Sequence, residues 1–178
     1  MNKIEIPLSK TKLLFGIGGS ILFVIIGFYL FTSIAEQQTR YSPTLVKGVG
    51  IAGIVFFGAT GIYGIKKSFD KTIGLTIDEH GIFDNTNASS VGLIMWNDIT
   101  EIKTEQVAST KFLLIYTENP EKYLDKVKGV KRKLMEGNNR MYGTPLSITS
   151  NTLKYNFSDL DKLINDKFNE HQERKPNR

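Results

Sequence analysis

Two long uncharged stretches dominate the first part of the chain. Residues 13–35 contain no charged side chain, and neither do residues 48–65. As α-helices at 1.5 Å per residue they are about 34 Å and about 27 Å long, close to the roughly 30 Å of a bilayer's hydrocarbon core. Leu45 and Val46 lengthen the second stretch and leave Lys47 at its rim. We therefore expect two transmembrane helices, at residues 13–35 and 46–65, joined as a hairpin.

Each span has an alternative interpretation. The first stretch resembles a secretory signal peptide, since Ser33 and Ala35 have the spacing of a cleavage site and basic residues precede it. Its apolar core is, however, much longer than the usual 7–15 residues or so, which favours an uncleaved span. The second stretch could be a re-entrant or interfacial segment, but it lacks the polar face that such a helix needs.

After residue 71 the pattern changes to short apolar runs separated by polar turns, which is typical of β-strands. We expect Gly81 to adopt a positive φ in the tight turn between the first two strands. Strands in series imply an antiparallel meander that must curl or be covered. The predicted strands are residues 72–77, 82–83, 91–96, 99–107, 111–117 and 144–148, with a further candidate at 152–155.

Two helical patterns follow or interrupt these strands. The first begins at Asn119-Pro120 and continues to about Glu136, where Gly137 is expected to end it. The second begins at Ser158, a favourable N-cap. Its apolar residues recur on one face, at Leu160, Leu163, Ile164 and Phe168.

The charge of the chain is unevenly distributed. The formal charge of +5 lies entirely in residues 1–71, which hold eight Lys/Arg against three Asp/Glu, whereas residues 72–178 hold fifteen of each. Three lysines precede the first span and three follow the second, whereas only Arg40 and Lys47 lie between them. Basic residues collect on the cytoplasmic side, so we expect a multi-pass inner-membrane protein with both termini in the cytoplasm.

The strongest local charge feature is a basic segment in the first helical pattern. Its members are Lys126, Lys128, Lys131, Arg132 and Lys133. Three interpretations remain open: a solvated helix face, contact with anionic lipid headgroups, and nucleic-acid binding. The last is disfavoured because residues 72–178 are neutral overall and carry no recognition motif. An apolar stripe on the same pattern, Tyr123, Val127, Val130 and Leu134, could face the sheet or the bilayer.

Small residues recur at helical spacing in the second span. They are Gly50, Gly53, Gly61 and Gly64. Such residues let helix backbones approach closely in lipid, either within the hairpin or between copies of the chain. Neither span contains an ionisable side chain apart from Lys47 at the rim. Because ion pathways and proton relays need such groups, a channel or transporter is disfavoured.

The sequence offers little catalytic chemistry. It has no Cys and two His, His80 in a predicted turn and His171 near the chain end, and it has no phosphate-binding glycine loop or nucleophile elbow. Trp96 is the single Trp, and we interpret it as packing beneath the last helix, with Asp98 capping the adjacent turn. We expect no enzyme activity, no catalytic residue, no metal site and no cofactor.

Several motifs together carry a resemblance to a known family. Residues 74–85, with the turn Asp78-Glu-His-Gly81, and residues 92–102, with Trp96-Asn-Asp-Ile99, resemble the opening hairpins of bacterial pleckstrin-homology-like (PH-like) domains. The whole chain, including residues 119–123 and 131–145, resembles a family of small bacterial two-span membrane proteins of unknown function. The resemblance implies a bent antiparallel sheet capped by a C-terminal helix, and it assigns no catalytic residue.

The expected protein is thus an α+β membrane protein. Residues 1–71 form the transmembrane hairpin, residues 72–173 a PH-like cytosolic domain, and residues 174–178 a flexible tail. The expected function is a membrane-anchored, non-enzymatic scaffold or adaptor that binds a protein partner or anionic lipid headgroups. The alternative is an oligomeric membrane sensor or assembly subunit that acts through the glycine-lined spans.

Overall fold

The computed structural model describes residues 2–174, which form two compact units. One unit is the helical stretch 10–71, and the other combines residues 2–9 with residues 72–174. The predicted hairpin comprises all of residues 1–71, but the structure places residues 2–9 in the second unit, here called the folded domain. Residues 175–178 of the expected tail lie outside the described residues.

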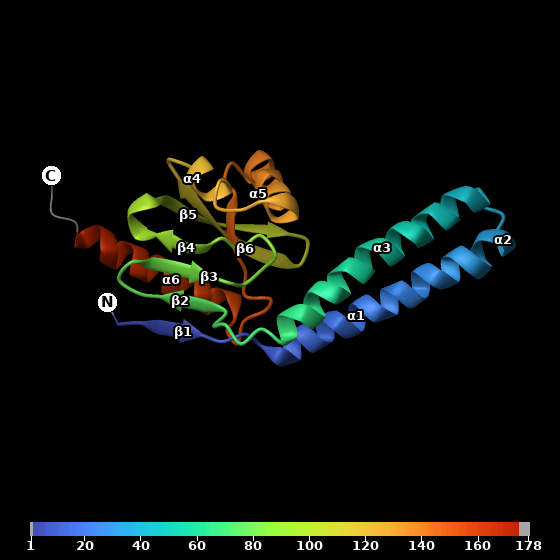
Figure 1. The fold of residues 1–178 in the computed structure, drawn as a ribbon, viewed down its shortest axis with the longest axis horizontal. Helices are drawn as coiled ribbons and strands as arrows, with labels where there is room; N and C mark the ends of the chain where they lie inside the picture. The colour runs from blue at the N-terminus through green and yellow to red at the C-terminus, as the bar shows by residue number, and fades with distance from the viewer. Residues whose placement is uncertain (1, 175–178) are drawn as a thin grey trace. The chain divides into compact units, whose positions relative to one another are not determined.

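The helical unit is an antiparallel pair (Figure 1). Its elements are α1 (Lys10–Tyr29), a π-helical turn (Leu30–Ile34), α2 (Ala35–Gln37) and α3 (Pro43–Ser68). Ser42 caps α3, since its Oγ accepts a hydrogen bond from the Leu45 amide at 3.2 Å. The two helical stretches, residues 10–37 and 43–68, are about 42 Å and about 39 Å long. Both extend a few residues beyond the predicted spans.

The apolar side chains of this pair point mostly outward. In the most apolar stretch of each helix, only 17% of the residues are buried in residues 10–37 and only 11% in residues 43–68. Phe15, for example, is 77% exposed. A core helix of a soluble protein would be mostly covered by its own chain. The two long apolar helices expected from the sequence are therefore confirmed as candidate membrane spans.

The folded domain contains two antiparallel sheets (Figure 1). The first has the strand order β1-β2-β3-β4, with bounds Ile4–Ile6, Leu75–Ile77, Gly81–Asp84 and Gly92–Met95. The second has the order β5-β6-β7, with bounds Ile99–Val107, Thr110–Thr117 and Leu146–Ile148. A 3₁₀ turn at Trp96–Asp98 separates β4 from β5 and divides the expected meander between the two sheets.

Strand β1 was not predicted, and it precedes the first apolar helix. Ile4 pairs with Ile77 and Ile6 with Leu75, so β1 extends the sheet beside β2. The following residues are also held by the domain, because the Ser9 amide donates to the Thr152 carbonyl at 2.7 Å and the Pro7 carbonyl accepts from the Lys154 amide at 2.9 Å. The N-terminal segment is therefore part of the folded domain.

The turn before β3 differs from the prediction. Gly81 does not have a positive φ but lies in the extended strand β3. A Cβ at this position would lie 2.0 Å from the Ile94 carbonyl oxygen, so glycine is required by the close approach of β4. The turn itself is held by Asp78, whose Oδ1 accepts from the His80 amide at 2.8 Å.

The single helix predicted for residues 120–136 is two helices. α4 (Glu121–Leu124) ends in a turn, and α5 (Gly129–Tyr142) begins after the extended residue Lys128. Gly129 has φ +62°, a left-handed conformation that suits glycine and breaks the continuous helix. Gly137 lies inside α5, and Gly143 (φ +77°) ends the helix instead.

Helix α6 (Phe157–Glu173) follows the last strand and completes the core. Asn156, not Ser158, is its N-cap, and it accepts a hydrogen bond from the Asp159 amide at 2.9 Å. Leu160 and Ile164 are fully buried, as the apolar face predicted. Residues 152–155 form no strand, only a bridge between Leu153 and Leu8. The helix pair, the antiparallel sheets and the C-terminal helix together confirm an α+β protein.

Candidate functional site

The structure separates the five residues of the basic segment into different environments. Lys126 turns back onto the domain, where its Nζ lies 3.4 Å from the Leu93 carbonyl oxygen and 4.4 Å from the centre of the Tyr123 ring. Lys131 donates to the Ser90 carbonyl at 2.8 Å. These two ammonium groups help to fix the α4–α5 region to strand β4 and to the loop that precedes it.

Arg132 is held by carboxylates from both helices. Its guanidinium contacts Glu136 at 2.8 Å, Asp125 at 3.0 Å and Glu121 at 3.7 Å. These hydrogen bonds raise the pKa of Arg132, so it is charged throughout the physiological range. Arg132 therefore joins α4 to α5, and its charge is neutralised locally.

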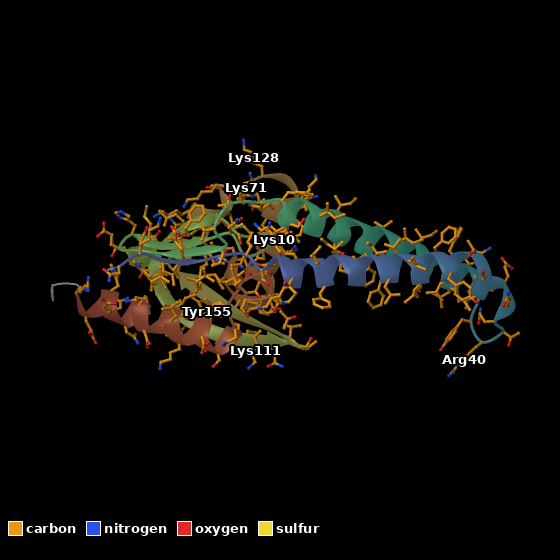
Figure 2. All side chains as sticks on the ribbon, turned by 90° about the horizontal axis from the view of Figure 1, so that it is seen from below. Lys10, Arg40, Lys71, Lys111, Lys128 and Tyr155 are labelled. Atoms are coloured by element: carbon orange, nitrogen blue, oxygen red, sulfur yellow. The ribbon has the colours of Figure 1, made fainter. Side chains whose placement is uncertain are left out.

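Lys128 and Lys133 are the members of the segment that point into solvent. Both are exposed, and within residues 2–174 neither side chain has a hydrogen bond or an ion pair. Figure 2 shows Lys128 projecting from the side of the domain opposite to Lys111. Arg140, one turn before the end of α5, is also exposed and also has no such partner in that range. The predicted basic segment lacks Arg140 because the predicted helix ends at Gly137, before this residue.

The predicted apolar stripe is divided in the same way. Tyr123 is fully buried and Val127 is half-buried against the core. Val130 is 75% exposed, Leu134 is 44% exposed, and Met141, outside the predicted helix, is 72% exposed. The first half of the stripe thus packs against the core, whereas the second half is exposed.

Tyr123 belongs to a polar cluster beside the 3₁₀ turn. Asp98 accepts hydrogen bonds from the Tyr123 hydroxyl and from Lys122 Nζ, both at 2.6 Å, instead of capping its turn as predicted. Desolvation alone would raise the pKa of Asp98, but these two hydrogen bonds outweigh it and lower the pKa below its usual value. Burial, together with the carboxylate, raises the pKa of Tyr123. Every polar group in the cluster has a structural partner.

Trp96 has the structural role that the sequence suggested. It is fully buried, and its Nε1 donates to the Asp78 carbonyl at 2.8 Å. Its ring lies 6.4 Å from that of Phe168 on α6, measured between centroids. Trp96 therefore connects the first turn of the domain to the closing helix and is not available as a binding platform.

The two histidines do not converge on a site. His80 is exposed beside Glu79, and His171 lies 3.1 Å from Asn97 Oδ1 while stacking near Trp96. In the part of the chain that the structure describes, no three His, Asp or Glu side chains are grouped as metal ligands. The surface depressions near α5 and α6 are open and shallow.

The four glycines of α3 singled out from the sequence differ in what lies next to them. A Cβ at Gly50 would lie 2.7 Å from the Gly27 carbonyl oxygen, and Gly61 and Gly64 lie against Ser20 and Ile17 of α1. Gly53 has nothing of the chain within 4 Å of its Cβ position. Ser20 and Thr60 add a hydroxyl contact of 3.3 Å between the helices. Three of the four glycines therefore lie at the α1–α3 contact, where backbones approach closely.

No protein family, curated protein or solved structure matches this chain.

Proposed function

We propose that this protein is a membrane-anchored, non-enzymatic adaptor. Its helix pair crosses the inner membrane as a hairpin and holds a PH-like domain at the cytoplasmic face, where the domain binds a protein partner or anionic lipid headgroups. The family of small bacterial two-span proteins that the sequence resembles has this layout.

The pairing of β1 with β2 carries the proposal. β1 precedes α1 and β2 follows α3, yet Ile4–Ile6 and Leu75–Ile77 are neighbours in one sheet. Two strands can pair only if both lie on the same side of a bilayer. Two crossings return the chain to the side on which it began, whereas one crossing would separate β1 from β2. The same pairing favours retention of α1, because cleavage after Ala35 would remove β1 from the sheet.

The distribution of basic residues supports the cytoplasmic side. Lys10 and Lys71 lie at one end of the helix pair and Arg40 at the other (Figure 2). The remaining basic residue of the connection, Lys47, is paired with Glu36 at 2.5 Å. The end that carries most lysines is the one from which both connections to the domain leave, in agreement with the positive-inside rule.

Antiparallel strands followed by a C-terminal helix support a PH-like domain. The strands form a four-stranded and a three-stranded sheet, whereas the resemblance implies one bent sheet. In this interpretation the hairpin is an insertion between the first two strands, and α4 with α5 is an insertion between β6 and β7.

The oligomeric alternative has less support. It relied on glycines that attract a second copy of the chain, but Gly50, Gly61 and Gly64 are occupied by α1 within the same chain. Close packing inside the hairpin is sufficient to explain them. The adaptor is therefore the preferred function.

Cysteine labelling of the full chain tests the topology, because the natural chain has no Cys. Single cysteines at Asn2, Arg40 and Lys162 would be treated with a membrane-impermeant maleimide in spheroplasts. We expect labelling at position 40 in intact spheroplasts, and at positions 2 and 162 only after lysis. Labelling of positions 2 and 162 from opposite sides of the membrane would overturn the proposal.

A further inference from the structure

Helix α5 carries an exposed stripe that the domain does not cover. Val130, Leu134 and Met141 lie within about 40° of one another around the helix axis at 100° per residue, with Gly137 between them. All three apolar side chains are exposed. A contiguous apolar stripe in water is unfavourable, and it marks a contact surface more often than a solvated one.

The opposite face of α5 is fixed to the domain, so the direction of the stripe is set. Met135 is fully buried, and Asn138 Nδ2 lies 3.3 Å from Ser147 Oγ on β7. At the end of the helix, the Tyr116 hydroxyl donates to the Tyr142 carbonyl at 2.9 Å. Rotation of α5 to bury the stripe would break all of these contacts.

Basic side chains lie beside the stripe and at the start of α5. Residues 121–142 hold seven Lys/Arg against three Asp/Glu, and Arg132 contacts all three of these carboxylates. Lys128, Lys133 and Arg140 remain exposed, and in the described residues no acidic group pairs with them. A surface that combines apolar side chains with unneutralised basic side chains is typical of helices that lie in the interface of anionic membranes.

The connections of the domain favour a membrane over a soluble partner. Only residues 7–9 and 69–74 separate the strands β1 and β2 from the apolar helices. A domain tethered through such short segments stays close to the bilayer that holds the hairpin, which raises the effective concentration of lipid at its surface.

We infer that α5 docks on the anionic leaflet of the membrane that anchors the chain. Val130, Leu134 and Met141 enter the interface, and Lys128, Lys133 and Arg140 contact lipid phosphates. This inference rests on the proposed function and names the ligand of the domain. The other three basic residues, Lys126, Lys131 and Arg132, hold the helix in place.

A fluorescence experiment on the full chain tests the inference. An environment-sensitive dye on a single cysteine at Met141 would be compared with the same dye at Lys111, which lies on the side of the domain opposite to Lys128 (Figure 2). The protein would be placed in nanodiscs of phosphatidylcholine, alone or mixed with phosphatidylglycerol. We expect a blue shift and quenching by spin-labelled lipid at position 141 in the anionic nanodiscs only, and neither effect at position 111.

Variants that remove basic residues make the test quantitative. Each basic residue near an anionic surface changes the ratio of docked to free domain about fivefold, so Lys128→Gln with Lys133→Gln should lower it about 25-fold. The matched control, Lys111→Gln with Lys154→Gln, removes the same charge elsewhere and should leave the ratio unchanged. An equal effect of the two double variants would overturn the assignment of Lys128 and Lys133.

The remaining outcomes separate the two proposals. A dye at position 141 that stays in water in both lipids, in protein that enters nanodiscs, overturns docking and leaves the adaptor intact. Equal shifts in the two lipids overturn the requirement for anionic headgroups. Protein that stays outside the nanodiscs overturns the anchoring itself.

Discussion

Large apolar side chains are mostly exposed in the helix pair but mostly buried in the folded domain. In the helix pair, Phe15 is 77% exposed and Val55 is 66% exposed, whereas Leu75 and Ile115 of the domain are fully buried. Water drives apolar groups to the inside of a domain, but a lipid environment imposes no such sorting. The helix pair therefore exposes the apolar side chains that the folded domain buries, although the chain as a whole has an ordinary apolar fraction of 40%.

The close contacts of the two regions also have different origins. In the helix pair, Gly50 and Gly27 bring two helix backbones together. In the domain, Gly81 admits the backbone of β4 within a hydrogen-bonded sheet. The helix contact combines close backbone packing with one hydroxyl contact between Ser20 and Thr60, while the sheet contact is reinforced by the buried core.

The largest effect is expected in the core of the domain. Trp96→Ala would remove a fully buried ring and its hydrogen bond, and should lower the free energy of unfolding of the domain by about 3–5 kcal/mol. Hydrogen exchange of the β6 amides would report the loss. Phe83→Ala, at a half-exposed position on β3, is the control and should cost no more than about 1 kcal/mol. Equal costs would contradict the assigned core.

A charged residue placed in the first helix tests whether that helix lies in lipid or in water. Ile25 is 60% exposed, so Ile25→Asp would be harmless on a soluble helix. In a membrane span it should make insertion less favourable by about 2.5–3.5 kcal/mol. The inserted fraction of α1 in a translocation assay measures this, with Ile25→Leu as the control. Normal insertion of the Asp variant would contradict the contrast between the two regions.

A smaller effect is expected at the helix contact. The added methyl group of Gly50→Ala would meet the Gly27 carbonyl oxygen, which should destabilise the α1–α3 pair by about 1–3 kcal/mol. Gly53→Ala enters open space and should change the pairing little. Titration with a denaturing detergent would compare them. A larger loss at position 53 would show that Gly53 faces another partner, such as a second copy of the chain.

The smallest effect concerns Asp98. Its pKa is lower in the folded domain than in the unfolded chain, so its carboxylate stabilises the fold above the unfolded pKa of about 3.9, and this contribution is lost as the pH falls through the folded pKa. Asp98→Asn should therefore cost about 1 kcal/mol at pH 7 and progressively less below pH 4 or so. Unfolding curves at several pH values measure the difference. The exposed Glu105→Gln is the control, and a pH-independent cost of Asp98→Asn would refute the role of its charge.

Much of the fold could be predicted from the sequence because the signals were local. The length of the uncharged runs predicted the helix pair, and the apolar face of residues 157–173 predicted the closing helix. The candidate site was less predictable, since the five basic residues of one segment share a sequence pattern but not an environment. Arg132 and Lys131 have partners that are near in space only because α4, α5 and the loop at Ser90 come together.

Composition and periodicity by themselves determined three features. They are the uncharged runs, the alternation of apolar and polar residues in the strands, and the apolar residues that recur every three or four positions in the helices. Those features depend on short-range backbone geometry and on the solvent. Tertiary structure alone decided that Ile4–Ile6 pairs with Leu75–Ile77 across the inserted helices, that Gly129 breaks a helix, and that Val130 and Met141 stay uncovered. A strand of three residues is stabilised by its neighbour rather than by its own sequence, so only the folded sheet can specify it.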